Sequence, residues 1–137
     1  MSSRSARNAV TPDPAPLVGR RIVASIGEPW DFTSTAGDNV LVGEIAAVSP
    51  PAEPVEWIIC EVSPFQAAGA TVSTVAAVRR YAGEEPVQQL QQRGEAHVQL
   101  LYDPSGAGLT AARVRDALRA GHGGLKHLIG SLRLAGA

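Results

Sequence analysis

The sequence predicts an α+β fold, either a strongly bent antiparallel sheet or a small, partly open β-barrel of five or six strands with two helices. Residues 39–81 hold three runs of strand-forming residues, separated by turn residues at 50–54 and 63–65. Connections this short favour antiparallel neighbours. Two later segments, 84–94 and 111–120, show apolar residues at helical spacing between helix-start and helix-stop residues. These two observations together predict a sheet with helices outside it.

Chain length and composition fit one domain. A chain of 137 residues can bury a substantial core without disulfides or metals. Hydrophobic residues make up 45% of the chain but aromatic residues only 4%, so we expect a core of Val, Leu, Ile and Ala. Residues 1–16 are polar, contain three prolines and lack apolar periodicity, which indicates a flexible N-terminal arm. We therefore assign 17–137 to a single globular domain.

The first half of the domain is predicted to form strands. We expect a short strand over 17–26, ended by Gly27 and Pro29. The run 39–48 is apolar on both faces and contains Gly43. A glycine inside a strand predicts a bulge or a closely approaching neighbour, as at the corners of small barrels.

The two following runs, 55–62 and 71–81, also carry apolar residues on both faces. Such a strand is central in its sheet or is covered by a helix on one side. The best available cover is the segment 111–120, whose apolar stripe would lie on the sheet. Its arginines would then face the acids at the strand ends.

The second half mixes helix and strand. Acids precede Pro86 and Gly94 follows, so 84–94 is predicted to hold a short helix. Alternation over 95–102 predicts a strand, and Thr110 is a suitable N-cap for the helix 111–120. Residues 125–135 fit either type. We favour a strand there, because Gly130 weakens a helix.

Charge is distributed unevenly along the chain. The formal net charge is −1, but residues 1–27 carry +3, residues 28–103 carry −8 and residues 104–137 carry +4. Two interpretations remain open. The basic ends fold back on the acidic middle and neutralise it, or the acidic middle faces a basic partner.

Cysteine content and hydropathy bear on location. Cys60 is the single cysteine, so the chain cannot form an internal disulfide, and a reducing cytoplasm is the natural setting. No run of about eighteen apolar residues is present, and the N-terminus lacks the hydrophobic core of a signal peptide. We expect a cytoplasmic protein without membrane contact.

No motif in the sequence fixes a chemistry. A nucleophile, base and orienting acid can be assembled from Cys60, His97 and Asp103, which would suit a small hydrolase or transferase. Against this, Cys60 lies in an apolar strand, where a thiol is normally inert. His122 and His127 are five residues apart, which does not suit a metal site, so we expect neither metal nor cofactor.

The candidate binding residues lie in the acidic middle. Trp30 and Phe32 supply half of the Trp and Phe residues within one loop, where they either plug the core or form a recognition patch. The acids taken as part of the same binding surface are Asp31, Asp38, Glu56 and Glu61. The last two also fit solvated strand ends.

These features lead to a functional hypothesis. The protein is a non-catalytic protein-binding or regulatory module with a basic partner; an acidic immunity or antitoxin-like protein would be a special case. Because the aromatic residues cluster in the acidic middle, the charge pattern argues against binding to nucleic acid. Association into a homo-oligomer is left open, and the alternative is the small enzyme with a site near Cys60, His97 and Asp103.

Overall fold

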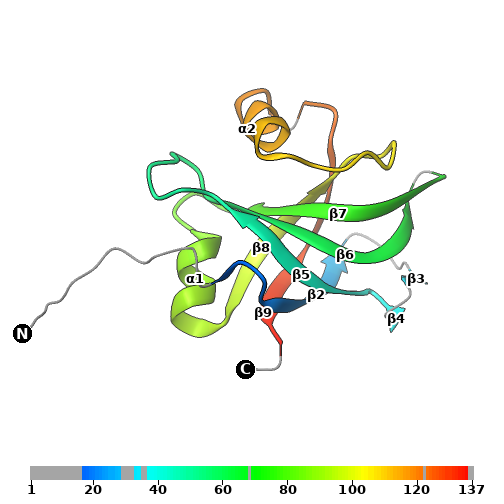
Figure 1. The fold of residues 1–137 in the computed structure, drawn as a ribbon, viewed down its shortest axis with the longest axis horizontal. Coiled ribbons are helices and arrows are strands. Elements are labelled where there is room, and N and C mark those ends of the chain that lie inside the picture. The colour runs from blue at the N-terminus through cyan, green and yellow to red at the C-terminus, as the bar shows by residue number, and fades with distance from the viewer. Residues whose placement is uncertain (1–16, 29–32, 35–36, 68, 122, 136–137) are drawn as a thin grey trace, which may run out of the picture.

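The described part of the chain forms a closed antiparallel barrel with two helices (Figure 1). The computed structural model describes residues 17–28, 33–34, 37–67, 69–121 and 123–135. The barrel strands are β2 (Arg21–Glu28), β5 (Val40–Val48), β6 (Trp57–Ala67), β7 (Ala70–Arg79), β8 (Glu95–Tyr102) and β9 (Lys126–Leu134). Each pairs antiparallel with the next, and β9 pairs with β2. The predicted α+β class and small barrel are confirmed, and the barrel is closed.

The remaining elements are attached to this ring. β3 (Thr33–Ser34) and β4 (Gly37–Asp38) pair with each other and join β6 where Ser34 lies opposite Phe65. Helix α1 (Pro86–Arg93) connects β7 to β8, and α2 (Ala111–Arg119) connects β8 to β9. The predicted arm over residues 1–16 lies outside the described residues.

Two predicted boundaries were wrong. The first strand begins at Arg21 rather than Leu17, because residues 17–20 form a turn in which the Arg20 N–H donates to the Leu17 carbonyl at 3.0 Å. Gly27 does not end the strand. It lies within β2, where the pairing with β9 shifts register between Ile26 and Glu28.

The predicted break at 63–65 was also wrong, because β6 runs through it to Ala67. The pairing of β6 with β7 shifts register between Glu61 and Phe65. Proline has no N–H to donate to a sheet, so it is tolerated in a strand at such an irregularity. Pro64 therefore bends β6 without ending it.

The predicted helix ends and the C-terminal strand are confirmed. Gly94 ends α1 with a left-handed φ of 75°, and its N–H donates to the Leu90 carbonyl at 2.9 Å. The Thr110 side chain caps α2 by accepting from the Arg113 N–H at 3.2 Å. Residues 126–134 form a strand, which confirms the preference based on Gly130.

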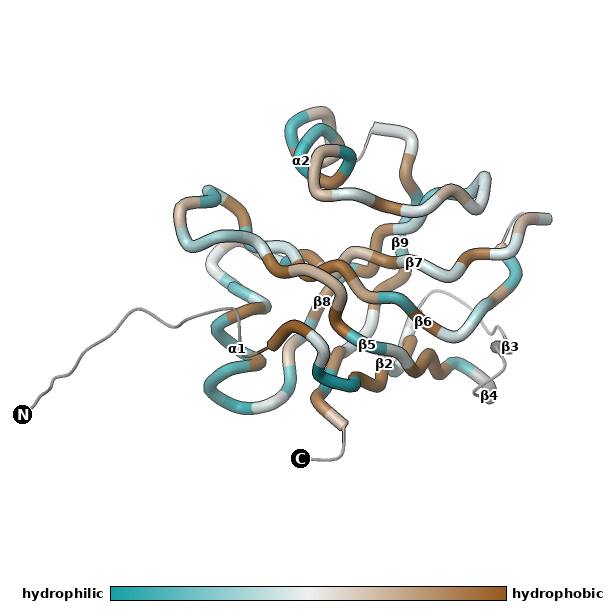
Figure 2. The backbone as a smooth tube through the Cα atoms, in the orientation of Figure 1, coloured by the Kyte–Doolittle hydropathy of each residue, from teal (hydrophilic) through white to brown (hydrophobic). Residues whose placement is uncertain are grey.

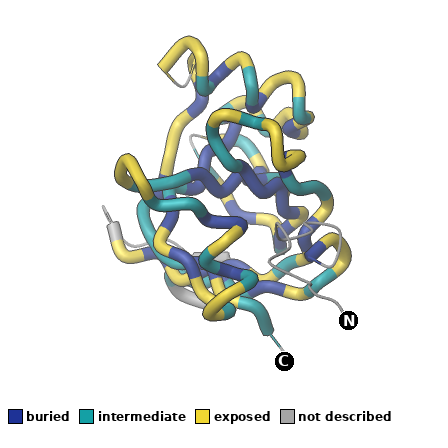
Figure 3. The backbone as a smooth tube through the Cα atoms, turned by 90° about the vertical axis from the view of Figure 1, so that its left-hand side faces the viewer, coloured by how far each residue is buried: buried dark blue, intermediate teal, exposed yellow. Residues whose placement is uncertain are grey.

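The main core fills the barrel with aliphatic residues. Ile22, Leu41, Ile45, Ile58 and Leu100 are among its fully buried members. Figure 2 shows the hydrophobic residues concentrated along the barrel strands, and Figure 3 shows buried stretches running through the middle of the molecule. Val87 and Leu90 of α1 belong to this same cluster, so α1 packs directly on the barrel core.

Two glycines allow the close strand contacts of a narrow barrel. A Cβ at Gly43 would lie 2.0 Å from the Glu61 carbonyl oxygen, and one at Gly130 would lie 2.1 Å from that of Ser25. The close neighbour predicted for Gly43 is confirmed. Residues larger than glycine would push these strands apart.

A second hydrophobic cluster lies between α2 and the outer face of the sheet. Trp57 and Ile59 of β6 pack there with Val114 and Ala117 of α2 and with Leu101 of β8. This arrangement confirms that α2 covers the strand that is apolar on both faces.

Two arginines of α2 pair with acids from the middle of the chain. Arg113 contacts Asp103 at 2.6 Å, and Arg115 contacts Glu53 at 2.8 Å. Part of the basic C-terminal segment therefore does neutralise the acidic body. The Arg115 guanidinium also lies 5.5 Å from the centre of the Trp57 ring, whose N–H donates to Glu53 at 3.1 Å.

Candidate functional site: an outer sheet face and a pocket beside α1

The aromatic loop lies outside the described residues. Trp30, Asp31 and Phe32 are not among the described residues, and for Asp38 in β4 the backbone alone is described. The choice between a core plug and a recognition patch therefore stays a prediction. The loop is followed by β3, which is held against β6 at Phe65.

Glu56 has a structural task. One of its oxygens accepts from the backbone N–H groups of Val87, at 2.8 Å, and Gln88, at 3.3 Å, and the other from the Gln88 side chain at 3.3 Å. These N–H groups belong to the first turn of α1, whose own N-cap residue, Glu85, makes no side-chain capping bond. Glu56 thus caps a helix that lies 31 residues away in sequence.

Glu61 lies on an outward face instead. It is inside β6 rather than at a strand end, and it stands directly opposite Glu44 of β5. Arg21 of β2 is opposite Glu44 on the other side, and all three residues are exposed. Among the described residues, neither glutamate forms an ion pair within 4.0 Å. Like charges directly opposite on neighbouring strands destabilise a sheet.

The same face is hollowed and partly apolar. An open hollow of about 610 Å³ runs along β2, β5 and β6. Val42 beside the two glutamates is 41% exposed. The lining residues are Arg21, Ile22, Val23, Val42, Gly43, Glu44, Glu61, Val62 and Ala135. We call this surface the acidic face.

The residues of the enzyme alternative do not converge. Cys60 points into the barrel and is fully buried, and burial raises the pKa of its thiol to about 12. His97 is exposed on the outside of β8. Asp103 follows the far end of that strand, roughly 20 Å from His97 at the rise of a β-strand. The barrel wall and the length of β8 separate the three groups.

Asp103 is held by its own turn. Its carboxylate accepts from the Ser105 N–H at 2.8 Å and from the Ser105 hydroxyl at 2.7 Å, and it pairs with Arg113. These contacts, the backbone bond first, lower the pKa of Asp103 to about 2. Within the described residues, no three His, Cys, Asp or Glu side chains gather as a metal ion would require.

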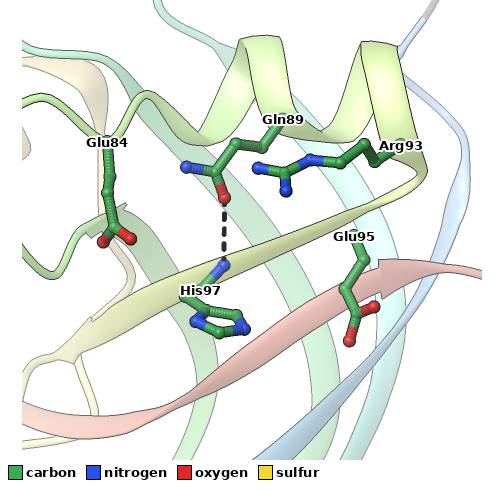
Figure 4. Close-up of a pocket in the computed structure, with 5 residues that line it drawn as sticks. All are labelled: Glu84, Gln89, Arg93, Glu95 and His97. Atoms are coloured by element: carbon green, nitrogen blue, oxygen red, sulfur yellow. Dashed lines mark hydrogen bonds between the residues drawn. The ribbon is translucent and has the colours of Figure 1, made fainter.

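His97 instead lines a pocket with residues that the sequence interpretation did not connect (Figure 4). The cavity measures about 170 Å³, and its lining consists of Glu84, Gln89, Arg93, Glu95 and His97. One hydrogen bond joins these residues, from the His97 backbone N–H to Gln89 Oε1 at 3.3 Å.

Local geometry builds this pocket. Gln89 and Arg93 are four residues apart and share one face of α1. Glu95 and His97 are two apart and share the outer face of β8. Gly94, in its left-handed conformation, turns the chain between them, so both pairs line the same cavity. The signal was therefore present in the sequence as a helix pair and a strand pair on either side of one glycine.

Comparison of the chain with protein-family models, with curated proteins and with solved structures found no match. No helix in the described part of the chain is long and apolar enough to cross a membrane.

Proposed function

We propose that this protein is a non-catalytic protein-binding or regulatory module that contacts a basic partner through the acidic face. The observation that carries the proposal is the pair Glu44 and Glu61, placed opposite each other, exposed, and without an ion pair to any described residue. A basic side chain placed between them would offset the repulsion that the free protein tolerates.

The surroundings of the pair support a protein partner. Val42 provides apolar area beside the charges, and the hollow along three strands offers a concave surface. Interfaces combine such apolar area with charges that select and orient the partner. The loop with Trp30 and Phe32 is proposed to extend this surface, since it is joined to β3, which pairs with the strand that carries Glu61.

Free-protein stability gives the first test. Replacing Glu61 with Gln removes one of two facing charges, so the free energy of unfolding is expected to stay constant or rise by up to about 0.5 kcal/mol. A purely structural carboxylate would give the opposite sign. Urea unfolding of the wild type and E61Q measures this difference.

Partner binding gives the second test. The immobilised chain is incubated with native lysate at about 0.05 M and about 0.5 M salt, because exposed charge pairs are screened by salt. We expect basic proteins to be retained at low salt by the wild type and by the control D116K, and to be lost from E61K. Asp116 suits the control because it is an exposed acid on α2, away from the acidic face.

The purified partner is then titrated against each variant. We expect E61K to weaken its binding roughly tenfold, which corresponds to about 1.4 kcal/mol, and D116K to leave binding unchanged. Retention that ignores both salt and E61K would contradict the proposal, as would the absence of any retained partner at low salt.

A further inference from the structure

We propose that the pocket between α1 and β8 binds a small aminocarboxylate, a molecule with an ammonium group and a carboxylate separated by a short chain. This site is distinct from the acidic face and does not depend on its function. The pocket has a volume of about 170 Å³, and one hydrogen bond, from the His97 N–H to Gln89 Oε1, joins its lining residues.

Glu84 defines the end of the pocket that would take a cation. Its Oε1 atom is buried and has no hydrogen-bond partner among the described residues. A buried carboxylate oxygen without a partner is costly, and buried polar groups are nearly always paired. An ammonium group in the pocket would add beside the Glu84 carboxylate the positive charge that the described residues do not supply.

The neighbouring carboxylate differs in this respect. Glu85 forms an ion pair with Arg79 at 4.0 Å, so its charge already has a partner within the protein. Two adjacent glutamates in the same turn therefore have different surroundings, and only one of them lines the pocket.

Arg93 defines the end that would take an anion. It is exposed and makes no ion pair with any described residue, although Glu84 and Glu85 lie on the turn before α1 and Glu95 lies on β8. A guanidinium binds a carboxylate with two parallel hydrogen bonds. Gln89 accepts from His97 through Oε1, which leaves its side-chain amide N–H groups facing the cavity as further donors.

The arrangement of these groups sets the shape of the ligand. Figure 4 shows Glu84 and Arg93 at opposite sides of the pocket with Gln89 between them, so the two charges of the ligand must be separated. Drug-sized ligands occupy pockets of roughly 300–1,000 Å³, so a cavity of this size admits a small molecule rather than a nucleotide.

The test titrates the ¹⁵N-labelled full chain with glycine, β-alanine, γ-aminobutyrate and δ-aminovalerate, and follows the backbone amides by NMR. Butylamine and butyrate serve as ligands with one charge each. We expect one chain length to shift the amides of residues 84–97 with the highest affinity, and either single-charge ligand to bind at least tenfold more weakly.

Variants then assign the two ends. E84Q and R93Q are each expected to weaken the best aminocarboxylate at least tenfold, while E85Q, the adjacent glutamate that faces Arg79, leaves it unchanged. R93Q is also expected to remove the preference for the aminocarboxylate over butylamine. Because E84Q removes the charge from a side chain with one buried, unpartnered oxygen, its urea midpoint should equal or exceed that of the wild type, which separates loss of binding from loss of fold.

Several results would overturn the proposal. These are no amide shift with any aminocarboxylate, equal binding of butylamine and γ-aminobutyrate across the series, or equal affinity of E84Q and E85Q. None of them bears on the acidic face, because Glu44 and Glu61 are unchanged in every variant.

Discussion

Replacing Glu56 with alanine should destabilise the protein through helix α1. The carboxylate accepts from the Val87 and Gln88 N–H groups at 2.8 and 3.3 Å, and the helix has no other side-chain cap at Glu85. Loss of a cap costs about 0.5–2 kcal/mol, and loss of a negative charge at a helix N-terminus costs about 0.3–1 kcal/mol. We expect E56A to lower the free energy of unfolding by about 1.5 kcal/mol. E56Q, which keeps an acceptor oxygen but not the charge, should lose about half of that.

The assay is urea unfolding followed by circular dichroism, with E61A as the matched control. Glu61 is an exposed glutamate that lies opposite Glu44 on one side and Thr74 on the other, so its removal should not destabilise the fold. The midpoint of E56A should fall while the slope with urea stays constant, because the surface exposed on unfolding is unchanged. A loss below about 0.3 kcal/mol in E56A would refute the capping role and leave Glu56 as a surface residue.

Further predictions concern strand contacts, acid stability and thiol reactivity. Alanine at Gly43 or Gly130 would place Cβ about 2 Å from a carbonyl oxygen of the neighbouring strand, so each variant should lose at least about 2 kcal/mol in urea unfolding. Asp103 has a folded pKa of about 2 against an ordinary 3.8, so it stabilises the fold above pH 3.8, and this contribution disappears as the pH falls through 2. The wild type should therefore lose its stability advantage over D103N across that range, as measured by urea midpoints at each pH; an equal difference at both ends would contradict the assignment. Cys60 should resist iodoacetamide in the native protein and react once urea unfolds it, as followed by mass spectrometry; rapid native labelling would show that β6 opens.

The parts of the fold that were predicted correctly rest on local signals. Thr110 and Gly94 mark helix ends through bonds to residues three or four positions away. The strand predicted over 55–62 is apolar on both faces, and it indicated a covering helix because its residues could not all face one core. Such signals lie within a single segment, so they can be recognised without knowing where the other segments lie in the fold.

Features that depend on distant residues could not be predicted. Closure of the barrel pairs Val23 with Arg133, and no local pattern specifies which strand lies beside β2. The prediction that the strand ends around Pro64 was wrong for a related reason. β6 pairs with β7 on both sides of the register shift, and this pairing with a distant segment continues the strand.

The candidate sites divide in the same way. The pocket pairs on α1 and β8 are local and could have been found, whereas the opposition of Glu44 and Glu61 depends on the register of two strands. The sequence placed Glu61 at a solvated strand end because the length of β6 was underestimated. The register of β5 and β6 places Glu61 opposite Glu44.

Some of the described arginines form ion pairs within the fold, and Arg93 does not. Arg113 and Arg115 of α2 form ion pairs with Asp103 and Glu53, which lie in the acidic middle of the chain. Helix α1 instead packs on the barrel core through Val87 and Leu90 and is capped by Glu56. Neither contact involves Arg93. The basic C-terminal segment therefore neutralises acids through α2. Arg93 of α1 and the facing Glu44 and Glu61 form no ion pair within the described residues, so their charges remain available to the proposed ligand and partner.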